Sequence, residues 1–361
     1  MSSIYKELKI LFKGKPNEKA LLDLFNKSYK KEKNFSDATR SLVYELFKDY
    51  NILVLDPDDH RLKLSFKEIA LDELKNFSTH KIVNNTIKKI KNSYDKKVKI
   101  QVNPRILNLF YLSKSKRYRI EFKEGEYVLI GKNITFKKDE FINHIESNPN
   151  SISPNVILRP LYQESILPNL AYVGGGSEIS YWLELSDLFK FYSLPFPILV
   201  VRKSLLLINK RDFEKIDNLN LKIQDFFLKK DQLIRKFLKS SDEYNFSLKN
   251  ILHSYTKNID ELKKELSSID NSLASVLEAL KTRHEKDFNS LEKKVIKAIK
   301  LKNSQKLKSI DKIFEKIFVN GTPQERFLNF SHFYAVYGHE FIDFIFSIIE
   351  PFDSRLQVCE I

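Results

Sequence analysis

The stretch LRPLYQESILPNLAYVGGGSEISYWLEL, residues 158–185, contains three of the chain's eight glycines side by side and its only tryptophan. Strands and helices that alternate over short connections are typical of parallel α/β proteins. The apolar runs around this stretch predict that alternation. The predicted order is a strand at 156–161 (VILRPL), a strand at 169–173 (NLAYV), a helix at 178–192 and a strand at 196–202 (FPILVVR).

The three glycines, Gly174, Gly175 and Gly176, fall between a predicted strand and a predicted helix. Glycine lets a ligand approach the backbone closely, and the first amides of a helix have no acceptor within the helix and favour an anion. Ser177 is predicted to cap this helix, with Glu178 in its first turn. The spacing matches neither G-x-G-x-x-G nor the loop that ends in Gly-Lys-Ser/Thr, so a tight strand-to-helix turn explains the glycines equally well.

Polar side chains near the predicted strand ends extend this candidate site. Ligands of open α/β sheets bind at the carboxyl ends of the strands. The candidates for binding a substrate or nucleotide are Arg159, Gln163, Asn169, Tyr172, Arg202 and Ser204. Gln163 and Glu164 are expected in a loop, whereas Trp182 is most simply a core residue.

The sequence before residue 150 predicts helices, further strands and a hairpin. ILVLD at 52–56 is typical of a buried parallel strand. The acidic residues that follow, Asp56, Asp58 and Asp59, have the chemistry of metal ligands, but such residues more often cap the next helix. The other predicted elements are two helices within 17–50 (the second capped near Ser36), helices at 66–76, 81–94 and 138–146, strands VKIQV (98–102) and NLFYL (108–112), and a hairpin at 117–136 around Glu124-Gly125.

Residues 219–318 contain neither proline nor glycine, which predicts long helices. Their apolar residues recur at alternating steps of three and four, the pattern of a coiled coil. These positions are Ile259, Leu262, Leu266, Ile269, Leu273, Val276 and Leu280. We predict an antiparallel hairpin with its tip at 267–272. A homodimer through this segment is expected, although the hairpin itself would satisfy much of the seam.

These patterns divide the chain into five segments. The last of them, 319–361, predicts aromatic-rich helices and a possible final strand at LQVCEI. The segments are a partial Rossmann-like core (1–97), a small connecting insertion with a β-hairpin (98–150), a second part of the core with the glycine loop (151–218), an α-helical coiled-coil hairpin (219–318), and C-terminal helices that return to the core (319–361).

Composition narrows the function classes. The formal charge of +15 is spread along the chain and mostly carried by lysine, which favours a solvated surface over a dedicated nucleic-acid face. The single cysteine, Cys359, forms no internal disulfide, which fits a cytoplasmic protein. No apolar run approaches the length that a membrane span needs, and no metal-binding His motif or nucleophile elbow is present.

Several segments together resemble the bacillithiol-biosynthesis cysteine-adding enzymes, also called cysteine ligases. They are SPNVILRPLYQESILPNLAYVGGGSEISYWLEL, LPFPILVVRKSLLLI, the long hairpin, NGTPQERFLNF and, upstream, RSLVYELFKDYNILVLDPDDHRLK with the NLFYL strand. The resemblance covers nearly the whole chain from about Ala38 onward. It implies a Rossmann-type core related to class I aminoacyl-ligase folds, a small connecting insertion and a coiled-coil arm associated with dimers.

The resemblance also implies a reaction. Cysteine is joined through its carboxyl group to the amine of glucosaminyl-malate, with ATP as co-substrate and Mg²⁺ as a possible companion. Arg159 or Arg202 would hold a carboxylate or phosphate, and Glu178 would pair with an ammonium group or take its proton. The glycine-loop amides would stabilise developing negative charge.

Two departures from the family pattern leave an alternative open. The family is expected to be longer at its N-terminus, with a T-G-H-Q-like nucleotide motif that residues 1–50 lack. A histidine and an acidic residue are expected where this chain has Asn103 and Ile106, which affects the assignment of Asn108 as a site residue. The core is therefore expected to be incomplete at its N-terminus. The alternative is a truncated or inactive member that acts as a coiled-coil interaction protein.

Overall fold

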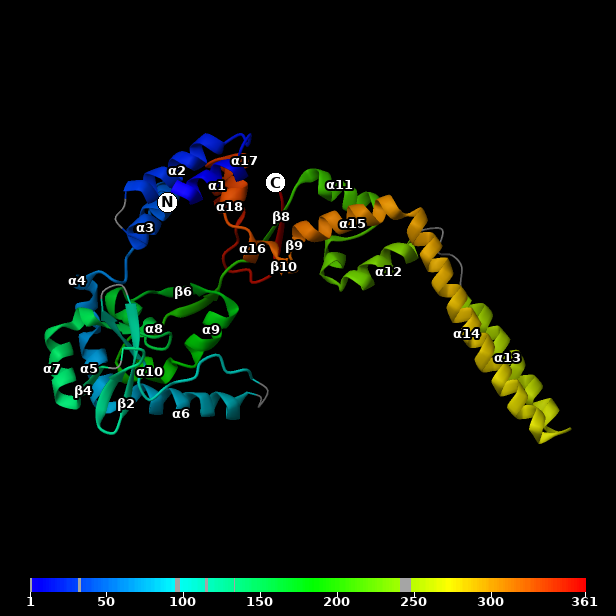
Figure 1. The fold of residues 1–361 in the computed structure, drawn as a ribbon, viewed down its shortest axis with the longest axis horizontal. Coiled ribbons are helices and arrows are strands. Elements are labelled where there is room, and N and C mark those ends of the chain that lie inside the picture. Colours follow the sequence, from blue (N-terminus) through cyan, green and yellow to red (C-terminus); the bar gives the residue numbers. More distant parts are fainter. Residues whose placement is uncertain (1, 32–33, 95–97, 114–115, 133, 241–247) are drawn as a thin grey trace. The chain divides into compact units, whose positions relative to one another are not determined.

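The computed structural model describes residues 2–31, 34–94, 98–113, 116–132, 134–240 and 248–361 (Figure 1). The chain forms two compact units. Unit 1 comprises residues 1–204 and 330–355, and unit 2 comprises residues 205–329 and 356–361. The polar candidates and the glycines named above all belong to unit 1.

A small helical group in unit 1 brings the N-terminal segment together with a late segment of the chain. Phe12, Leu21 and Ala335 form its buried core. The backbone N–H of Asn17 donates to Ala335 O at 2.9 Å, and its side chain donates to Val336 O at 2.9 Å. The helices are α1 (Ser2–Leu11), α2 (Glu18–Lys31), α3 (Phe35–Phe47), α17 (Ser331–Tyr337) and α18 (Glu340–Ile348). The two predicted helices in 17–50 are confirmed, with Asn34 rather than Ser36 as the cap of α3.

Residues 109–154 contain an antiparallel sheet of five strands in the order β4-β3-β2-β1-β5. The predicted hairpin is confirmed, and Glu124 (φ 51°) and Gly125 (φ 85°) make its turn. The strands are β1 (Leu109–Ser113), β2 (Lys116–Lys123), β3 (Glu126–Leu129), β4 (Ile134–Lys137) and β5 (Ile152–Pro154). NLFYL therefore forms a strand as predicted, paired with both β2 and β5.

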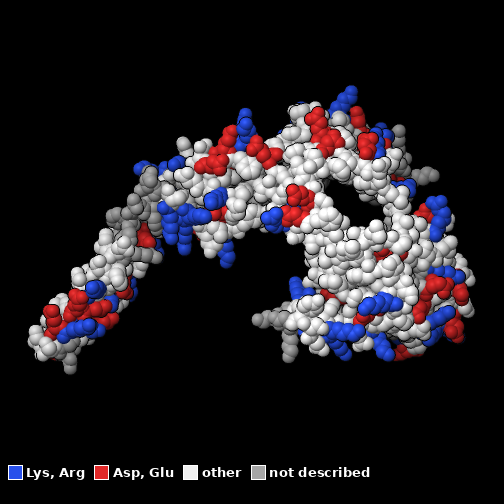
Figure 2. Space-filling view, turned by 180° about the vertical axis from the view of Figure 1, so that it is seen from behind, with Lys and Arg blue, Asp and Glu red and all other residues white. Residues whose placement is uncertain are grey.

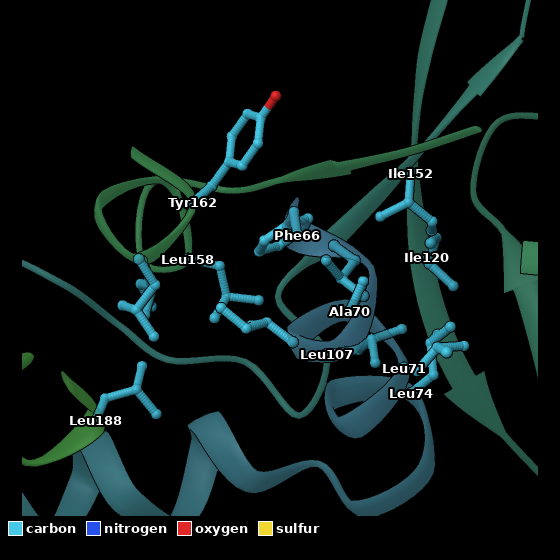
Figure 3. Close-up of a cluster of buried hydrophobic side chains, with 14 of the residues drawn as sticks. Phe66, Ala70, Leu71, Leu74, Leu107, Ile120, Ile152, Leu158, Tyr162 and Leu188 are labelled. Carbon is cyan, nitrogen blue, oxygen red and sulfur yellow. The ribbon is translucent and has the colours of Figure 1, made fainter. Parts of the chain in front are cut away.

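Helices pack on this sheet through a shared apolar core. In α6 the buried residues Thr79, Val83, Thr86 and Ile87 follow helical spacing and define one face. Figure 3 shows Ile120 and Ile152 of the sheet beside Leu71 and Leu74 of α5. The helices are α4 (His60–Lys63), α5 (Lys67–Asn76), α6 (Ser78–Ser93) and α7 (Lys138–Ser147). The helices predicted at 66–76, 81–94 and 138–146 are thus confirmed.

A pair of parallel strands, β6 (Ala171–Gly174) and β7 (Ile198–Val201), carries the glycines. Helices α9 (Gly176–Leu183) and α10 (Ser186–Phe191) connect the two strands, and α8 (Arg159–Ile166) precedes them. The predicted strands at 169–173 and 196–202 and the helix between them are confirmed. Trp182 is fully buried, as expected of a core residue.

Three predicted strands are wrong. Residues 156–161 (VILRPL) turn into α8, because the Asn155 side chain accepts from the N–H groups of Ile157 and Leu158 and Pro160 suits the first helical turn. Gln163 and Glu164 consequently lie in a helix and not in a loop. Residues 98–102 (VKIQV) form neither helix nor strand, and none of the described strands pairs with them. There the carboxylate of Glu184 accepts from the backbone N–H groups of Gln101 and Val102.

The third wrong strand is ILVLD at 52–56. This segment has no regular secondary structure, and no strand pairs with it among the described residues. Ile52, Leu53 and Leu55 are exposed rather than buried. An apolar run becomes a buried strand only where a neighbouring strand and a covering layer are present, and this segment has neither.

Unit 2 combines a small α-helical core with a long helical hairpin. Helices α13 (Leu248–Ser267) and α14 (Asn271–Lys302) run side by side in opposite directions (Figure 1), and Asp270 caps α14 at the predicted tip. Strands β8 (Leu205–Ile208) and β11 (Gln357–Glu360) pair in parallel, which confirms the predicted final strand. The remaining elements are α11 (Lys210–Asn218), α12 (Lys230–Ser240), α15 (Ser304–Ile317), the β9–β10 hairpin (Phe318–Val319 and Thr322–Pro323) and α16 (Gln324–Phe327).

A buried carboxylate makes the stability of unit 1 depend on pH. Burial raises the pKa of Glu73, although its hydrogen bonds from Thr79 and Asn108 oppose the shift. The folded state therefore holds this proton to a higher pH than the unfolded state. Between the two pKa values, stability falls as pH rises. We predict that the free energy of unfolding of wild type minus that of Glu73→Gln decreases between pH 4.5 and 8, as measured by urea denaturation. A difference that stays constant or grows with pH would contradict this prediction.

Candidate functional site

The glycine triplet is a tight strand-to-helix turn with one close contact. Strand β6 ends at Gly174, and α9 begins at Gly176. A Cβ atom at Gly174 would lie 2.7 Å from Cε1 of Tyr172 and 3.2 Å from Cβ of Glu178, whereas one at Gly176 would meet no atom within 4 Å. Gly174 is therefore required for packing, and the space beside Gly176 is open.

Two side chains of opposite charge face the second glycine. Glu178 Oε2 accepts from Gly175 N at 2.8 Å, so this carboxylate, and not the predicted Ser177, closes the start of the helix. A Cβ atom at Gly175 would lie 3.5 Å from Glu178 Oε2 and 3.6 Å from Nε of Arg202. Within the described part of the chain, neither Glu178 nor Arg202 forms an ion pair. Both charges thus lie at the carboxyl ends of parallel strands and are available to a ligand. We call Gly175, Gly176, Glu178 and Arg202 the glycine cluster.

A separate pocket of about 310 Å³ lies beside α8. Its polar lining consists of Arg159, Gln163, Asn169 and Tyr162. Arg159 is partly buried, and its Nη1 donates to Gln163 Oε1 at 2.9 Å, one turn along α8. Among the described residues no carboxylate pairs with Arg159, so its charge is free to bind an anion. The apolar lining is Leu55, Pro57, Leu62, Ile166 and Leu167.

Tyr172 connects this pocket to the glycine cluster. Its hydroxyl lies 3.5 Å from Arg159 Nη2, and its ring stacks on Trp182 with the ring centroids 4.0 Å apart. The same ring is the closest neighbour of Gly174. Tyr181 of α9 supplies a second hydroxyl, 3.4 Å from Arg159 Nη2. The stacked rings of Tyr172 and Trp182 therefore fix the position of the Arg159 pocket relative to the glycine cluster.

A buried glutamate fixes the far end of the pocket. Glu164 Oε2 accepts from the backbone N–H of Asn169 at 2.7 Å, and Glu164 Oε1 accepts from its side chain at 2.8 Å. Gln163 Nε2 donates to the same carboxylate at 3.0 Å. Glu164 thereby sets the orientation of two predicted binding residues without facing a ligand itself.

Two further candidates lie apart from these groups. Asn108 is fully buried, and its side chain donates to Glu73 Oε1 at 3.0 Å and to Arg105 O at 2.8 Å. Its position gives it a role in holding the 105–108 turn against α5. Ser204 is partly buried at the end of unit 1, two residues after Arg202. The side chain of the neighbouring Lys203 is buried and contacts Asp353, with 3.5 Å between Nζ and Oδ2.

The acidic turn after residue 55 caps a helix. Asp59 caps α4 by accepting from the backbone N–H of Arg61 at 2.9 Å. Asp56 accepts from Ser36 Oγ, and Asp58 pairs with Lys63. Over the residues that the structure describes, no cluster of His, Cys, Asp and Glu has the geometry to hold a metal ion.

Sequence reasoning missed Tyr162 and Tyr181 as parts of the site. The Tyr162 hydroxyl donates to Pro57 O at 2.6 Å, and burial, reinforced by the nearby aspartates, raises its pKa to about 12. Figure 3 shows this side chain at the edge of the apolar cluster. Tyr181 lies three residues after Glu178, and this helical spacing is a signal from which the sequence could have placed the two side chains on one face of the helix.

Comparison with known proteins agrees with this architecture. The family model "Bacillithiol biosynthesis BshC, N-terminal Rossmann-like domain" matches residues 1–203, and "Bacillithiol biosynthesis BshC, C-terminal coiled-coil domain" matches residues 205–361. The chain belongs to the BshC family. The expected Rossmann-like and coiled-coil architecture is therefore confirmed.

Several relatives carry the name "Putative cysteine ligase BshC". The protein of Flavobacterium johnsoniae is 36% identical over 348 residues, which cover 96% of this chain and 64% of the relative. That of Flavobacterium psychrophilum is 38% identical over 342 residues (95% and 64%), and that of Christiangramia forsetii is 34% identical over 363 residues (99% and 66%). The chain thus spans slightly less than two thirds of the length of these relatives. Among the helices described here, none has the length and apolar character to cross a membrane.

The glycines give a direct test of this local structure. Gly174→Ala should lower the free energy of unfolding by about 1–3 kcal/mol, because the new methyl group pushes the Tyr172 ring away from Trp182. Gly176→Ala should leave it unchanged or slightly raise it, because the methyl group meets open space at a helical position. Thermal and urea denaturation measure both values. Equal effects at the two positions would contradict the packing described here.

Proposed function

We propose that this chain supplies substrate-binding residues of a cysteine ligase in bacillithiol biosynthesis. The reaction joins the carboxyl group of cysteine to the amine of glucosaminyl-malate, with ATP as co-substrate, in the cytoplasm. The names of the relatives support the ligase class. The observation that carries the proposal is that two opposite charges, Glu178 and Arg202, both lie close to Gly175, and neither forms an ion pair with another residue that the structure describes.

The glycine cluster suits the amino acid. Cysteine carries an ammonium group and a carboxylate on the same carbon atom, and Glu178 and Arg202 offer the complementary charges. A phosphate suits this position less well, because the Glu178 carboxylate already accepts from the Gly175 amide and would repel it. We therefore assign cysteine to the glycine cluster.

The Arg159 pocket suits a second anion. Its guanidinium is oriented by Gln163 and has no carboxylate partner in the described structure. The anion is a phosphate of ATP or a carboxylate of glucosaminyl-malate. The described residues provide no Mg²⁺ cluster of their own, so any Mg²⁺ is proposed to arrive with the nucleotide. This proposal leaves no role for nucleic acid.

We predict that Glu178→Gln and Arg159→Ala each lower kcat/KM for product formation by about 100-fold, since each removes a charge that contacts substrate. Glu178→Gln should chiefly raise the KM for cysteine, and Arg159→Ala should chiefly raise the KM for the anionic substrate. A coupled assay with ATP, cysteine and glucosaminyl-malate measures the product by mass, with the F. johnsoniae relative as positive control. The exposed Lys190→Ala, on α10, is the matched control and should keep wild-type activity.

Two outcomes decide the roles. Full turnover by Glu178→Gln or Arg159→Ala in an active preparation would disprove the role of that residue. If the unaltered chain forms no product while the relative is active, calorimetric measurement of cysteine binding becomes the deciding experiment. Cysteine that binds wild type and Glu178→Gln equally would then disprove the assignment of the glycine cluster.

We also propose a homodimer through the helical hairpin, and this surface supports the alternative role as an interaction protein. Ile269, Val276 and Leu291 are apolar and exposed on α13–α14 and its tip, although Ile259 and Leu277 are buried within the hairpin. The intramolecular pairing thus leaves part of the apolar seam uncovered. A second helical hairpin would cover it.

The dimer has its own test. Val276→Glu with Leu291→Glu should convert a dimer into a monomer in sedimentation equilibrium, because each buries a charge in the new interface. The double variant Thr282→Glu with Asn289→Glu adds the same charge at exposed positions on another face of α14 and should remain dimeric. A wild-type chain that is monomeric at high concentration would refute the proposal.

A further inference from the structure

The residue that follows Arg202 of the glycine cluster is a lysine with a buried side chain. Figure 2 shows many lysine and arginine side chains at the surface of the chain, whereas the Lys203 side chain is only 6% exposed. A buried ammonium group is costly unless it is paired and hydrogen-bonded. The partner of Lys203 lies 150 residues later in the sequence. Lys203 Nζ donates to Asp353 O at 3.1 Å and lies 3.5 Å from Asp353 Oδ2.

The Asp353 carboxylate is oriented independently of this lysine. Its Oδ1 accepts from the backbone N–H of Arg355 at 2.9 Å, and its Oδ2 accepts from Arg355 Nη2 at 2.9 Å. The backbone N–H of Asp353 donates to Glu350 O at 3.2 Å, which closes a turn. The Arg355 guanidinium holds the pKa of the Asp353 carboxyl below its usual range, so the group keeps its negative charge. Lys203 therefore contacts an acceptor whose position and charge are already set.

The segment that carries Arg202 is a three-residue connection, 202–204, between β7 and β8, and it has no regular secondary structure. One backbone hydrogen bond, from Arg202 N to Gly174 O at 2.8 Å, joins it to the end of β6. The contacts of Lys203 with Asp353 hold the next residue. These two attachments, one on each side of the Arg202 Cα atom, restrict the backbone from which the Arg202 side chain extends.

The position of the Arg202 guanidinium depends on this backbone. Its Nε and Cζ atoms would lie 3.6 and 3.7 Å from a Cβ atom at Gly175. Among the described residues no carboxylate pairs with Arg202, so no ion pair holds its guanidinium in place. A displacement of about 1 Å is enough to remove much of what a binding group contributes. The attachment of Lys203 thus bears directly on the glycine cluster.

We propose that Lys203 and Asp353 are a positioning pair for Arg202. Through the backbone of residues 202–203 they hold the Arg202 guanidinium beside Gly175, where it receives the carboxylate of an α-amino acid. Neither residue of the pair contacts the substrate. The pair thereby gives the glycine cluster its selectivity for an amine that also carries a carboxylate. This selectivity rests on the proposed function, whereas the position of Arg202 is measurable without any ligand.

Nuclear magnetic resonance relaxation of the Arg202 Nε–H group tests the positioning directly. In the unaltered chain its order parameter should be that of a rigid group, about 0.85, and in Asp353→Asn it should fall below about 0.6. Lys203→Met should have the same effect. Asp353 keeps Arg355 as its partner in that variant, so the chain should still fold. The signal that disappears in Arg202→Lys identifies the group.

Asp187→Asn is the matched control. Asp187 pairs with Lys89 of α6, and its side chain is 23% exposed, against 22% for Asp353. This substitution should leave the Arg202 order parameter unchanged. The inference is overturned by an Arg202 side chain that is already flexible in the unaltered chain, or that stays rigid in folded Asp353→Asn and Lys203→Met. Unfolding of both variants also overturns it, because the pair would then serve the fold alone.

Two ligands separate this inference from the proposed function. Calorimetry compares cysteine with cysteamine, which keeps the thiol and the ammonium group but lacks the carboxylate. Asp353→Asn should weaken cysteine binding about tenfold and leave cysteamine binding unchanged, and it should have no further effect in Arg202→Ala. Equal weakening of both ligands indicates a general disturbance of the site and overturns the inference. A rigid Arg202 that Asp353→Asn releases, in a chain that binds no cysteine, disproves the proposed function alone.

Discussion

The contact between the Tyr172 ring and Gly174 is the constraint on which the site depends. A side chain at position 174 would occupy the place of the ring, whose centroid is 4.0 Å from that of Trp182. This packing lets β6 turn directly into α9, so the Glu178 carboxylate reaches the Gly175 amide and the Arg202 side chain reaches the same glycine. The same tyrosine places its hydroxyl beside Arg159. One aromatic side chain thus links the core, the glycine cluster and the anion pocket.

Much of the fold could be predicted from the sequence, because the apolar periodicity of a segment matches its structure where that segment packs against a partner element. The faces of α5 and α6, the hairpin at Glu124-Gly125 and the tip of the helical hairpin at Asp270 all follow local rules of spacing and capping. The strands predicted at 52–56 and 98–102 failed for another reason. Strand formation needs a neighbour that the sequence of the segment does not contain. For 98–102 the neighbour is one carboxylate, Glu184.

The site was predictable only in part. Glycines, arginines and a glutamate near strand ends indicated a binding place, and Glu178 and Arg202 do meet at Gly175. The sequence did not predict that the candidates separate into the glycine cluster and the Arg159 pocket. The separation arises because the chain after residue 155 forms α8 and not a strand, and α8 carries Arg159 and Gln163. The structural role of Asn108 was equally hidden, since it depends on Glu73, which lies 35 residues earlier in the sequence.

The central claim is that cysteine binds where β6 turns into α9, between Glu178 and Arg202. Hydrogen exchange of the chain with and without saturating cysteine tests it most directly. The account predicts that the amides of Gly176 and Ser177 exchange more slowly with cysteine present, and that serine, which lacks the thiol but keeps both charged groups, gives a weaker version of the same pattern. Cysteine binding with protection confined to other segments, and none at residues 175–178, would contradict it.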